Sequence, residues 1–218
     1  MPTVDTNVIN GFAALVLLAM FVIVASSRMP TLVRVFALQS LALGLMAASV
    51  AYFTGFEHIY VVAGLTIVLK VMVIPRALTY VMERIKLERE VEPLVNIPSS
   101  LLISGALAIL AYYITEPMIS SGTAITRNVL ALSLAVVLIG FFIMISRKKA
   151  LTQVIGLLTM ENGLFMAAIS TTYGMPLIVE LGIFFDVLIA VLIMGIFAFR
   201  INKTFETLDT TFLRRLRD

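Results

Sequence analysis

Two carboxylates lie inside long apolar runs in the C-terminal third of the chain. Glu161 belongs to an apolar stretch at 150–171, and Asp186 belongs to the next stretch, at 177–199. A charged side chain near the centre of a bilayer costs at least about 2.5–3.5 kcal/mol, so such residues usually face a protein interior or a water-filled path. Two acids in neighbouring helices predict a proton or ion relay. The alternative for each acid is a hydrogen bond to an adjacent helix that only fixes packing.

Lys70 lies near the middle of another apolar stretch, at 59–81. A lysine that stays charged in hydrocarbon needs an acidic partner or a water-filled path. We interpret it either as a relay lysine or a fixed positive charge beside one of the acids, or as a pairing residue that locks this chain to another. Pro75 removes a helical hydrogen bond and is expected to kink the helix near Arg76, which would leave a carbonyl open to water.

Gln39 and Glu180 are further candidates for the same path. Gln39 lies within the apolar stretch at 31–54, where an amide either orders water along a path or ties helices together. Glu180 precedes Asp186 by six residues and lies on roughly the same side of a helix. Because Glu180 is close to the start of its stretch, an ordinary solvated side chain is the alternative.

The composition excludes a soluble core with a polar coat. Hydrophobic residues make up 61% of the 218 residues, charged residues make up 13%, and the mean hydropathy is +1.07. The chain is therefore expected to be an all-α integral membrane protein in a lipid bilayer. It has no cysteine and one histidine, so we expect no disulfide, cofactor or metal site and no catalytic centre of its own. A net charge of +3, spread over the loops, gives no indication of nucleic acid binding.

Seven stretches are long enough to cross a bilayer as helices, since about 20 apolar residues suffice. The first is interpreted as a retained helix rather than a signal peptide, because no small-residue cleavage site follows it. The stretches lie at about 8–27, 31–54, 59–81, 99–115, 125–146, 150–171 and 177–199.

Basic residues predict the orientation, because short cytoplasmic loops are enriched in lysine and arginine. They cluster after the first, third, fifth and seventh stretches, whereas the other side has essentially Arg127 alone. This pattern predicts an outside N-terminus, a cytoplasmic C-terminus and an odd number of spans. The charged segment 83–98 is expected to continue the third helix outside the membrane, with docking to a partner as the alternative. Pro93 and Pro98 are expected to stop it before Ser99 and Ser100, which can cap the fourth helix.

An internal repeat indicates how the spans are organised. A shift of 119 positions aligns Leu32 with Leu151 and Gly44 with Gly163, and each half ends in a helix with a central ionisable residue. We therefore expect two parallel three-helix units, with the fourth helix as a linker. Small residues such as Gly156 are expected at close helix contacts. The predicted units are 1–82, 83–98 (charged linker), 99–118 (linker helix), 119–201 and 202–218 (cytoplasmic tail).

The run from Gln153 to Gly163 (QVIGLLTMENG), followed by Asp186, resembles the K subunit of respiratory complex I, to which small subunits of multisubunit cation/proton antiporters are related. In that alignment the family's two membrane glutamates fall on Leu158, one turn before Glu161, and on Asp186. In the first half the corresponding positions are Gln39 and Lys70. Taken over nearly its whole length, and in the tail around Leu213, the chain resembles the hydrogenase-4 component E family.

This resemblance implies a non-catalytic subunit in the inner membrane of a prokaryote. Its implied partners are antiporter-like and quinone-site-like membrane subunits, beneath a peripheral nickel–iron hydrogenase and iron–sulfur arm of the formate hydrogenlyase type. The implied task is to help couple electron transfer in that arm to movement of protons or other ions. A structural scaffold for the membrane arm, or a subunit of a multisubunit antiporter, is the alternative.

Overall fold

The computed structural model describes residues 6–84, 94–119, 127–172 and 182, and the regular structure in these ranges is entirely helical. Within these ranges, six helices are long and apolar enough to cross a membrane. The predicted seventh span, apart from Gly182, and the tail lie outside the described residues, as do Glu180 and Asp186. The elements are α1 (Thr6–Ala25), α2 (Met29–Thr54), α3 (Glu57–Thr66), the π-helix η1 (Ile67–Val73), α4 (Ile74–Arg84), α5 (Ile97–Ile119), α6 (Arg127–Ser146) and α7 (Ala150–Thr172).

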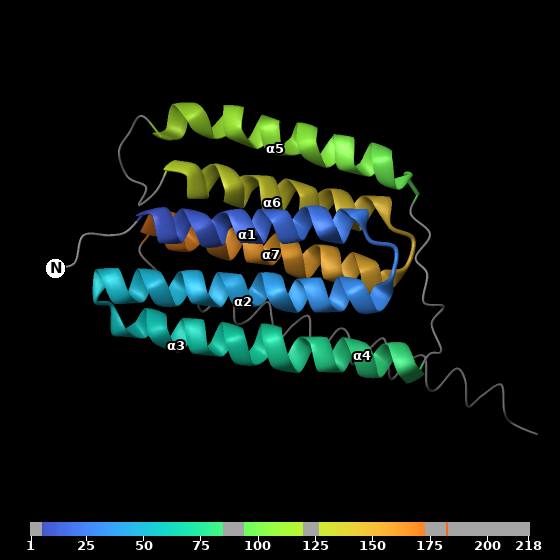
Figure 1. Cartoon of the computed structure of the whole chain (residues 1–218), viewed down its shortest axis with the longest axis horizontal. Coiled ribbons are helices and arrows are strands. Elements are labelled where there is room, and N and C mark those ends of the chain that lie inside the picture. The colour runs from blue at the N-terminus through green and yellow to red at the C-terminus, as the bar shows by residue number, and fades with distance from the viewer. Residues whose placement is uncertain (1–5, 85–93, 120–126, 173–181, 183–218) are drawn as a thin grey trace, which may run out of the picture.

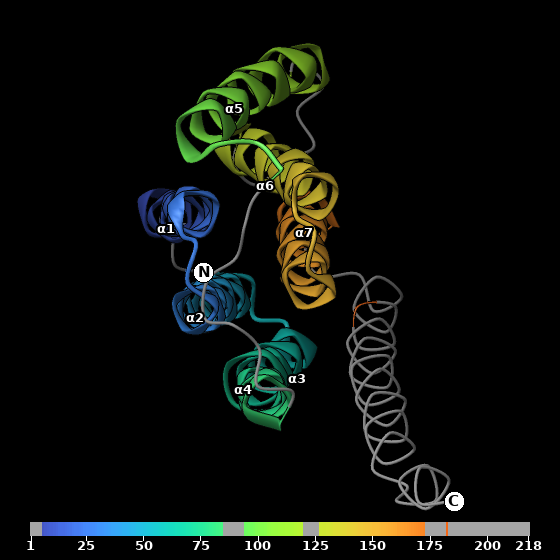
Figure 2. The same ribbon diagram turned by 90° about the vertical axis from the view of Figure 1, so that its right-hand side faces the viewer.

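The helices run side by side as a bundle (Figure 1). α2 packs against α1, against the continuous α3–η1–α4 rod and against α7, while α6 packs against α5, α7 and α1 (Figure 2). The core between these helices is aliphatic and aromatic, with Phe36 and Leu43 from α2 and Ile139 from α6 at 0% exposure. α2 and α7 are the spans most enclosed by the rest of the described bundle, and a polar side chain on the buried face of either one is removed from lipid.

Three of the four predicted basic loops lie at one end of this bundle. The α1–α2 junction, the end of α4 and the α6–α7 junction share that end, and the α2–α3 turn lies at the other (Figure 1). The fourth basic cluster follows residue 199 and lies outside the described residues. The arrangement agrees with the charge distribution from which the orientation was predicted.

Arg147 joins the two halves at the basic end. Its Nη2 donates to the carbonyl oxygens of Val24, at 2.9 Å, and Ser26, at 3.3 Å, at the end of α1. These carbonyls have no partner within their own helix, and a cation is favoured at a helix C-terminus. Burial lowers the pKa of Arg147, but an arginine keeps its charge at neutral pH. Arg147 therefore stabilises α1 from a position more than 100 residues further along the chain.

Glycines allow α6 and α7 to approach very closely. A Cβ added at Gly163 would lie 2.9 Å from the backbone nitrogen of Val137, and one added at Gly140 would lie 2.8 Å from that of Met160. Gly156 is equally close to Met144, and Gly44 on α2 faces Ile67 at 2.7 Å. The prediction that small residues mediate close helix contacts is confirmed at Gly44, Gly156 and Gly163.

The third span departs from a regular α-helix directly before Pro75. The irregularity is the π-helical stretch η1, where the backbone N–H of Ile74 bonds the carbonyl of Leu69, five residues back. The carbonyl that Pro75 leaves without an α-helical donor is that of Val71, four residues back. The Arg76 side chain donates to the next carbonyl, that of Met72, at 3.1 Å. The wider π-helical turn lies directly before Pro75, the residue that has no backbone N–H to donate.

The predicted caps of the fourth helix are wrong. α5 begins at Ile97, two residues before Ser99, and Asn96 Oδ1 accepts a hydrogen bond from the backbone N–H of Ser99 at 3.1 Å. Asparagine is a strong N-cap because its side chain satisfies an N–H that the first helical turn leaves without a partner. Pro98 is therefore inside the first turn, where its missing N–H costs nothing.

The close approach of α6 and α7 predicts that Gly163→Ala destabilises the protein. Its new methyl group would lie 2.9–3.0 Å from backbone atoms of α6, and such overpacking typically costs about 1–3 kcal/mol. Gly105→Ala on α5 is the matched control, since a Cβ there meets nothing within 4 Å and helix propensity favours alanine by up to about 1 kcal/mol. Denaturant unfolding in detergent measures both, and equal stability of the two variants would contradict the close contact.

Candidate functional site

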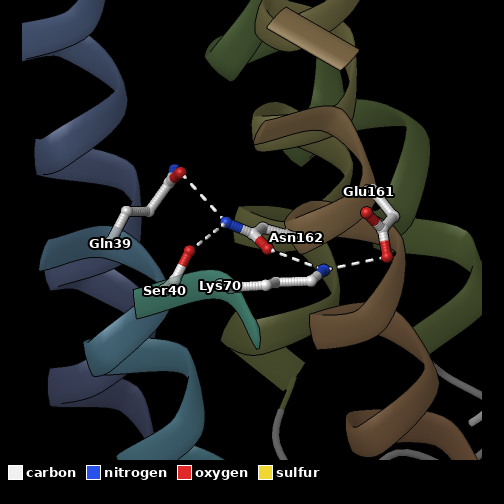
Figure 3. Close-up of polar contacts among 5 residues, drawn as sticks. All are labelled: Gln39, Ser40, Lys70, Glu161 and Asn162. Carbon is white, nitrogen blue, oxygen red and sulfur yellow. Dashed lines mark hydrogen bonds and ion pairs between the residues drawn. The ribbon is translucent and has the colours of Figure 1, made fainter. Parts of the chain in front are cut away.

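A buried ion pair joins the third span to α7. Lys70 Nζ lies 2.8 Å from Glu161 Oε1, and the side chains are 3% and 9% exposed (Figure 3). Lys70 lies in the middle of η1, and Glu161 lies near the middle of α7. A bond of this length between two charged groups is strong, and each charge removes most of the cost of burying the other. The pair satisfies the sequence-based expectation that Lys70 needs an acidic partner.

Asn162 connects this ion pair to α2. Its Oδ1 accepts a second hydrogen bond from Lys70 Nζ at 3.1 Å, and its Nδ2 lies 3.3 Å from Gln39 Oε1 and 3.2 Å from Ser40 Oγ. The residue is completely buried. Both ends of one amide are thus engaged, which fixes the orientation of the Asn162 side chain and directs its oxygen at the ammonium group of Lys70.

Gln39 extends the network to α1. It is completely buried, and its Nε2 donates to the carbonyl oxygen of Val16 at 3.2 Å. The network of Gln39, Ser40, Lys70, Glu161 and Asn162 therefore connects side chains from α2, η1 and α7 with the backbone of α1 (Figure 3). Gln39 acts here in helix packing, which is one of the two interpretations of it from the sequence.

Phe165 and Gly182 also lie close to the ion pair within the described residues. The ring of Phe165, one turn after Glu161 on α7, has its centroid 6.0 Å from Lys70 Nζ, at the limit of a cation–π contact. Gly182 approaches from the predicted last span, and a Cβ added there would lie 4.0 Å from Glu161 Oε1. The low exposure of both side chains strengthens the electrostatic attraction between them, because the local dielectric is low.

The structure brings together three of the five predicted path residues: Gln39, Lys70 and Glu161. Asp186 and Glu180 lie outside the described residues. Asn162 and Ser40, which are both buried, were not among the path residues predicted from the sequence. The available signal was that each lies beside a candidate residue within an otherwise apolar helix.

Only two members of this network can exchange a proton. The amides of Gln39 and Asn162 donate and accept hydrogen bonds but do not titrate, whereas the carboxyl group of Glu161 and the amine of Lys70 do. The network can therefore hold or move a proton at Oε1 of Glu161 and Nζ of Lys70, while the amides position these atoms. Among residues 6–84, 94–119, 127–172 and 182, no group of three or more His, Asp or Glu side chains could hold a metal ion.

Comparison with known proteins gives two kinds of relative. The chain is 43% identical over 131 residues to an uncharacterized protein of Mycobacterium tuberculosis, and this alignment covers 60% of each chain. It is 24% identical over 210 residues to Hydrogenase-4 component E of Escherichia coli K12, covering 96% of this chain and 97% of that protein. The same identity and coverage apply to Hydrogenase-4 component E of Shigella flexneri.

No family model and no solved structure matches the chain. The likeness to Hydrogenase-4 component E is distant, but it extends over almost the whole of both proteins. The two proteins therefore share their overall length and the order of their segments, and not only a single motif. This agrees in part with the resemblance stated from the residues alone.

The buried pair predicts a strong energetic coupling between Lys70 and Glu161. Lys70→Met and Glu161→Met should each cost about 3–5 kcal/mol, because each leaves one buried charge without its main counter-charge. The double variant should cost less than the sum of the two by about 2–3 kcal/mol. Denaturant unfolding of all four proteins in detergent measures this coupling.

Arg34→Met and Glu116→Met form the control cycle for this measurement. Both side chains are exposed, and they lie on α2 and α5, which do not pack extensively against each other. Their effects should be additive within about 0.5 kcal/mol. An equally additive result for Lys70 and Glu161 would mean that the ion pair does not contribute to stability.

Proposed function

We propose that this chain is a non-catalytic membrane subunit of a complex-I-like, energy-converting hydrogenase. The observation that carries the proposal is the near-full-length similarity to Hydrogenase-4 component E. The six long apolar helices support a place in the membrane arm. The partners would be antiporter-like and quinone-site-like membrane subunits together with peripheral nickel–iron hydrogenase and iron–sulfur subunits, in the inner membrane of a prokaryote.

Within that arm, the chain contributes to a proton or ion path at Lys70 and Glu161. The pair supports this role because it is the titratable part of a network enclosed by four helical elements. A proton that reaches Glu161 neutralises the carboxylate and leaves the Lys70 ammonium as a buried excess charge. That charge favours release of a proton from Lys70 or arrival of a counter-charge, and in this way one proton displaces the next. Asp186 and Glu180 are proposed to continue the path, and Gln39 to position it.

The chain is further proposed to consist of two parallel three-helix repeats joined by α5. The 119-residue shift supports this organisation because it aligns Gly44 with Gly163, two glycines at close helix contacts. The peripheral place of α5, which packs mainly on α6, fits a linker. The N-terminus would be outside and the C-terminus cytoplasmic.

The buried ion pair also favours a second function, a structural scaffold of the membrane arm. Paired charges inside a membrane protein can serve assembly alone, because removing either one destabilises the fold. A subunit of a multisubunit cation/proton antiporter is the remaining alternative. The three functions differ in their partners and in the effect of neutral substitutions.

The proposed complex predicts which proteins accompany this chain. Purification through a tag on the chain, in mild detergent and from its native membrane, should recover hydrogenase-like, iron–sulfur and antiporter-like subunits in defined ratios by mass spectrometry. Recovery of antiporter subunits without a hydrogenase would instead support the antiporter alternative. A homogeneous chain without partners would contradict all three functions.

The proposed path predicts that Glu161→Gln uncouples ion movement from hydrogenase activity. In membrane vesicles, the ratio of ions moved to hydrogen formed should fall at least about tenfold, because the amide cannot take up a proton. The complex should remain assembled. Glu116→Gln, at an exposed position near the end of α5, is the control and should leave the ratio unchanged. Loss of the whole complex would favour the scaffold, and full coupling in Glu161→Gln would refute the path.

A further inference from the structure

The third span exposes a charged side chain at a depth where a lipid-facing helix should be apolar. The candidate span runs from Ile59 to Glu83, so its midpoint is Val71, and Arg76 lies five residues beyond that point. At 1.5 Å per residue this is about 7.5 Å along the helix axis, roughly half of the distance to the edge of a 30 Å hydrocarbon layer. Arg76 is nevertheless exposed on the surface of the bundle.

The Arg76 side chain does not extend toward the nearer membrane surface. Its Nη1 donates to the carbonyl oxygen of Met72, one turn back toward the midpoint of the span, at 3.1 Å. A long basic side chain that faces lipid normally reaches toward the polar interface, which here would be the direction of Glu83. The observed conformation therefore keeps the guanidinium within the hydrocarbon depth.

The described part of the protein gives Arg76 no counter-charge. Among the residues that the structure describes, the recorded salt bridge is that of Lys70 and Glu161, and the single recorded hydrogen bond of Arg76 is the one to Met72. A guanidinium carries five N–H donors in a planar fork, and a carboxylate matches that fork with two parallel hydrogen bonds. Most of the N–H donors of Arg76 are therefore available to an acceptor that comes from outside the described part of the protein.

The neighbours of Arg76 form one continuous strip along the helix. They follow the spacing of three and four residues that places side chains on one helical face. α4 packs chiefly against α2, which leaves this face uncovered within the described bundle. We call it the Arg76 strip, and its exposed members are Met72, Val73, Arg76, Thr79 and Tyr80.

We propose that the Arg76 strip is the docking surface for a transmembrane helix of another subunit, and that this helix presents an aspartate or glutamate to Arg76. Charge complementarity supports the choice of occupant: lipid tails cannot accept hydrogen bonds, and an apolar helix would bury the guanidinium without a counter-ion. The apolar members of the strip supply packing, and the Arg76–carboxylate pair fixes the depth and orientation of the partner. The inference rests on the proposed function only for the existence of partner subunits.

A photo-crosslinking experiment on the intact complex in its native membrane tests this surface. The photoreactive amino acid p-benzoylphenylalanine replaces Val73 in the strip, and in a separate protein it replaces Leu38, which is 63% exposed on α2. We expect the Val73 reporter to crosslink to a membrane-spanning peptide of another subunit, with a carboxylate within one helical turn of the attachment point. The Leu38 reporter should not label that peptide.

A second arm tests the charge. Arg76→Gln should reduce the yield of that crosslink at least tenfold, whereas Arg76→Lys, which keeps the charge, should retain more of it than Arg76→Gln does. Arg34→Gln, an exposed arginine on α2, should leave the yield unchanged. If Arg76→Gln prevents assembly, the protein that keeps Arg76 decides the question. Its crosslinked peptide must carry a carboxylate within one helical turn of the attachment point.

Crosslinks confined to lipid, to the chain's own residues 173–218, or to a helix without a nearby carboxylate would overturn the docking surface. These outcomes differ from a failure of the proposed function, which would appear as a carboxylate-bearing partner helix that does not come from a hydrogenase or antiporter-like complex. In that case the docking surface would stand and the assignment of the complex would fail.

Discussion

A charged amine inside a membrane bundle must meet an opposite charge, and this constraint organises the structure. Lys70 on η1 and Glu161 on α7 satisfy it at 2.8 Å, although 91 positions separate them in the chain. The ion pair requires the third span and α7 to lie at the same depth and to face each other. Asn162, Gln39 and Ser40 then fix the pair laterally through hydrogen bonds that reach α2 and α1. The polar centre and the helix packing are therefore one arrangement.

Close backbone contact is the second condition for this centre. Gly140 and Gly163 bring α6 and α7 together at the level of Met160, next to Glu161. With little side-chain volume between the two helices, α7 has few ways to rotate about its axis. Glu161 and Asn162 consequently point at Lys70 and at α2 as a consecutive pair. A membrane site can obtain precision in this way from glycine and amide side chains.

The sequence predicts the large-scale features well because bilayer thickness, charge and helix length act along the chain. The six spans within the described residues and the grouping of three basic loops at one end follow from such rules. The sequence also shows that Lys70 needs an acidic partner. It does not show that this partner is Glu161, because the pairing depends on how each helix is rotated about its axis. The π-helical stretch around Lys70 changes that rotation, and no local propensity distinguishes it from α-helix. The N-cap at Asn96 was missed because Ser99 and Ser100 are equally good capping residues, and tertiary contacts decide between them.

The separation of Lys70 from Glu161 also bears on how the protein is made. Ribosomes add about 5–20 residues per second, so Lys70 is synthesised about 5–18 s before its counter-charge 91 residues later. Arg147, which satisfies the last carbonyls of α1, is also made long after that helix. The first three helices thus enter the membrane with a lysine that has not met Glu161 and a helix end that has not been capped. The contacts that join the two halves therefore form only after the first three helices have been synthesised.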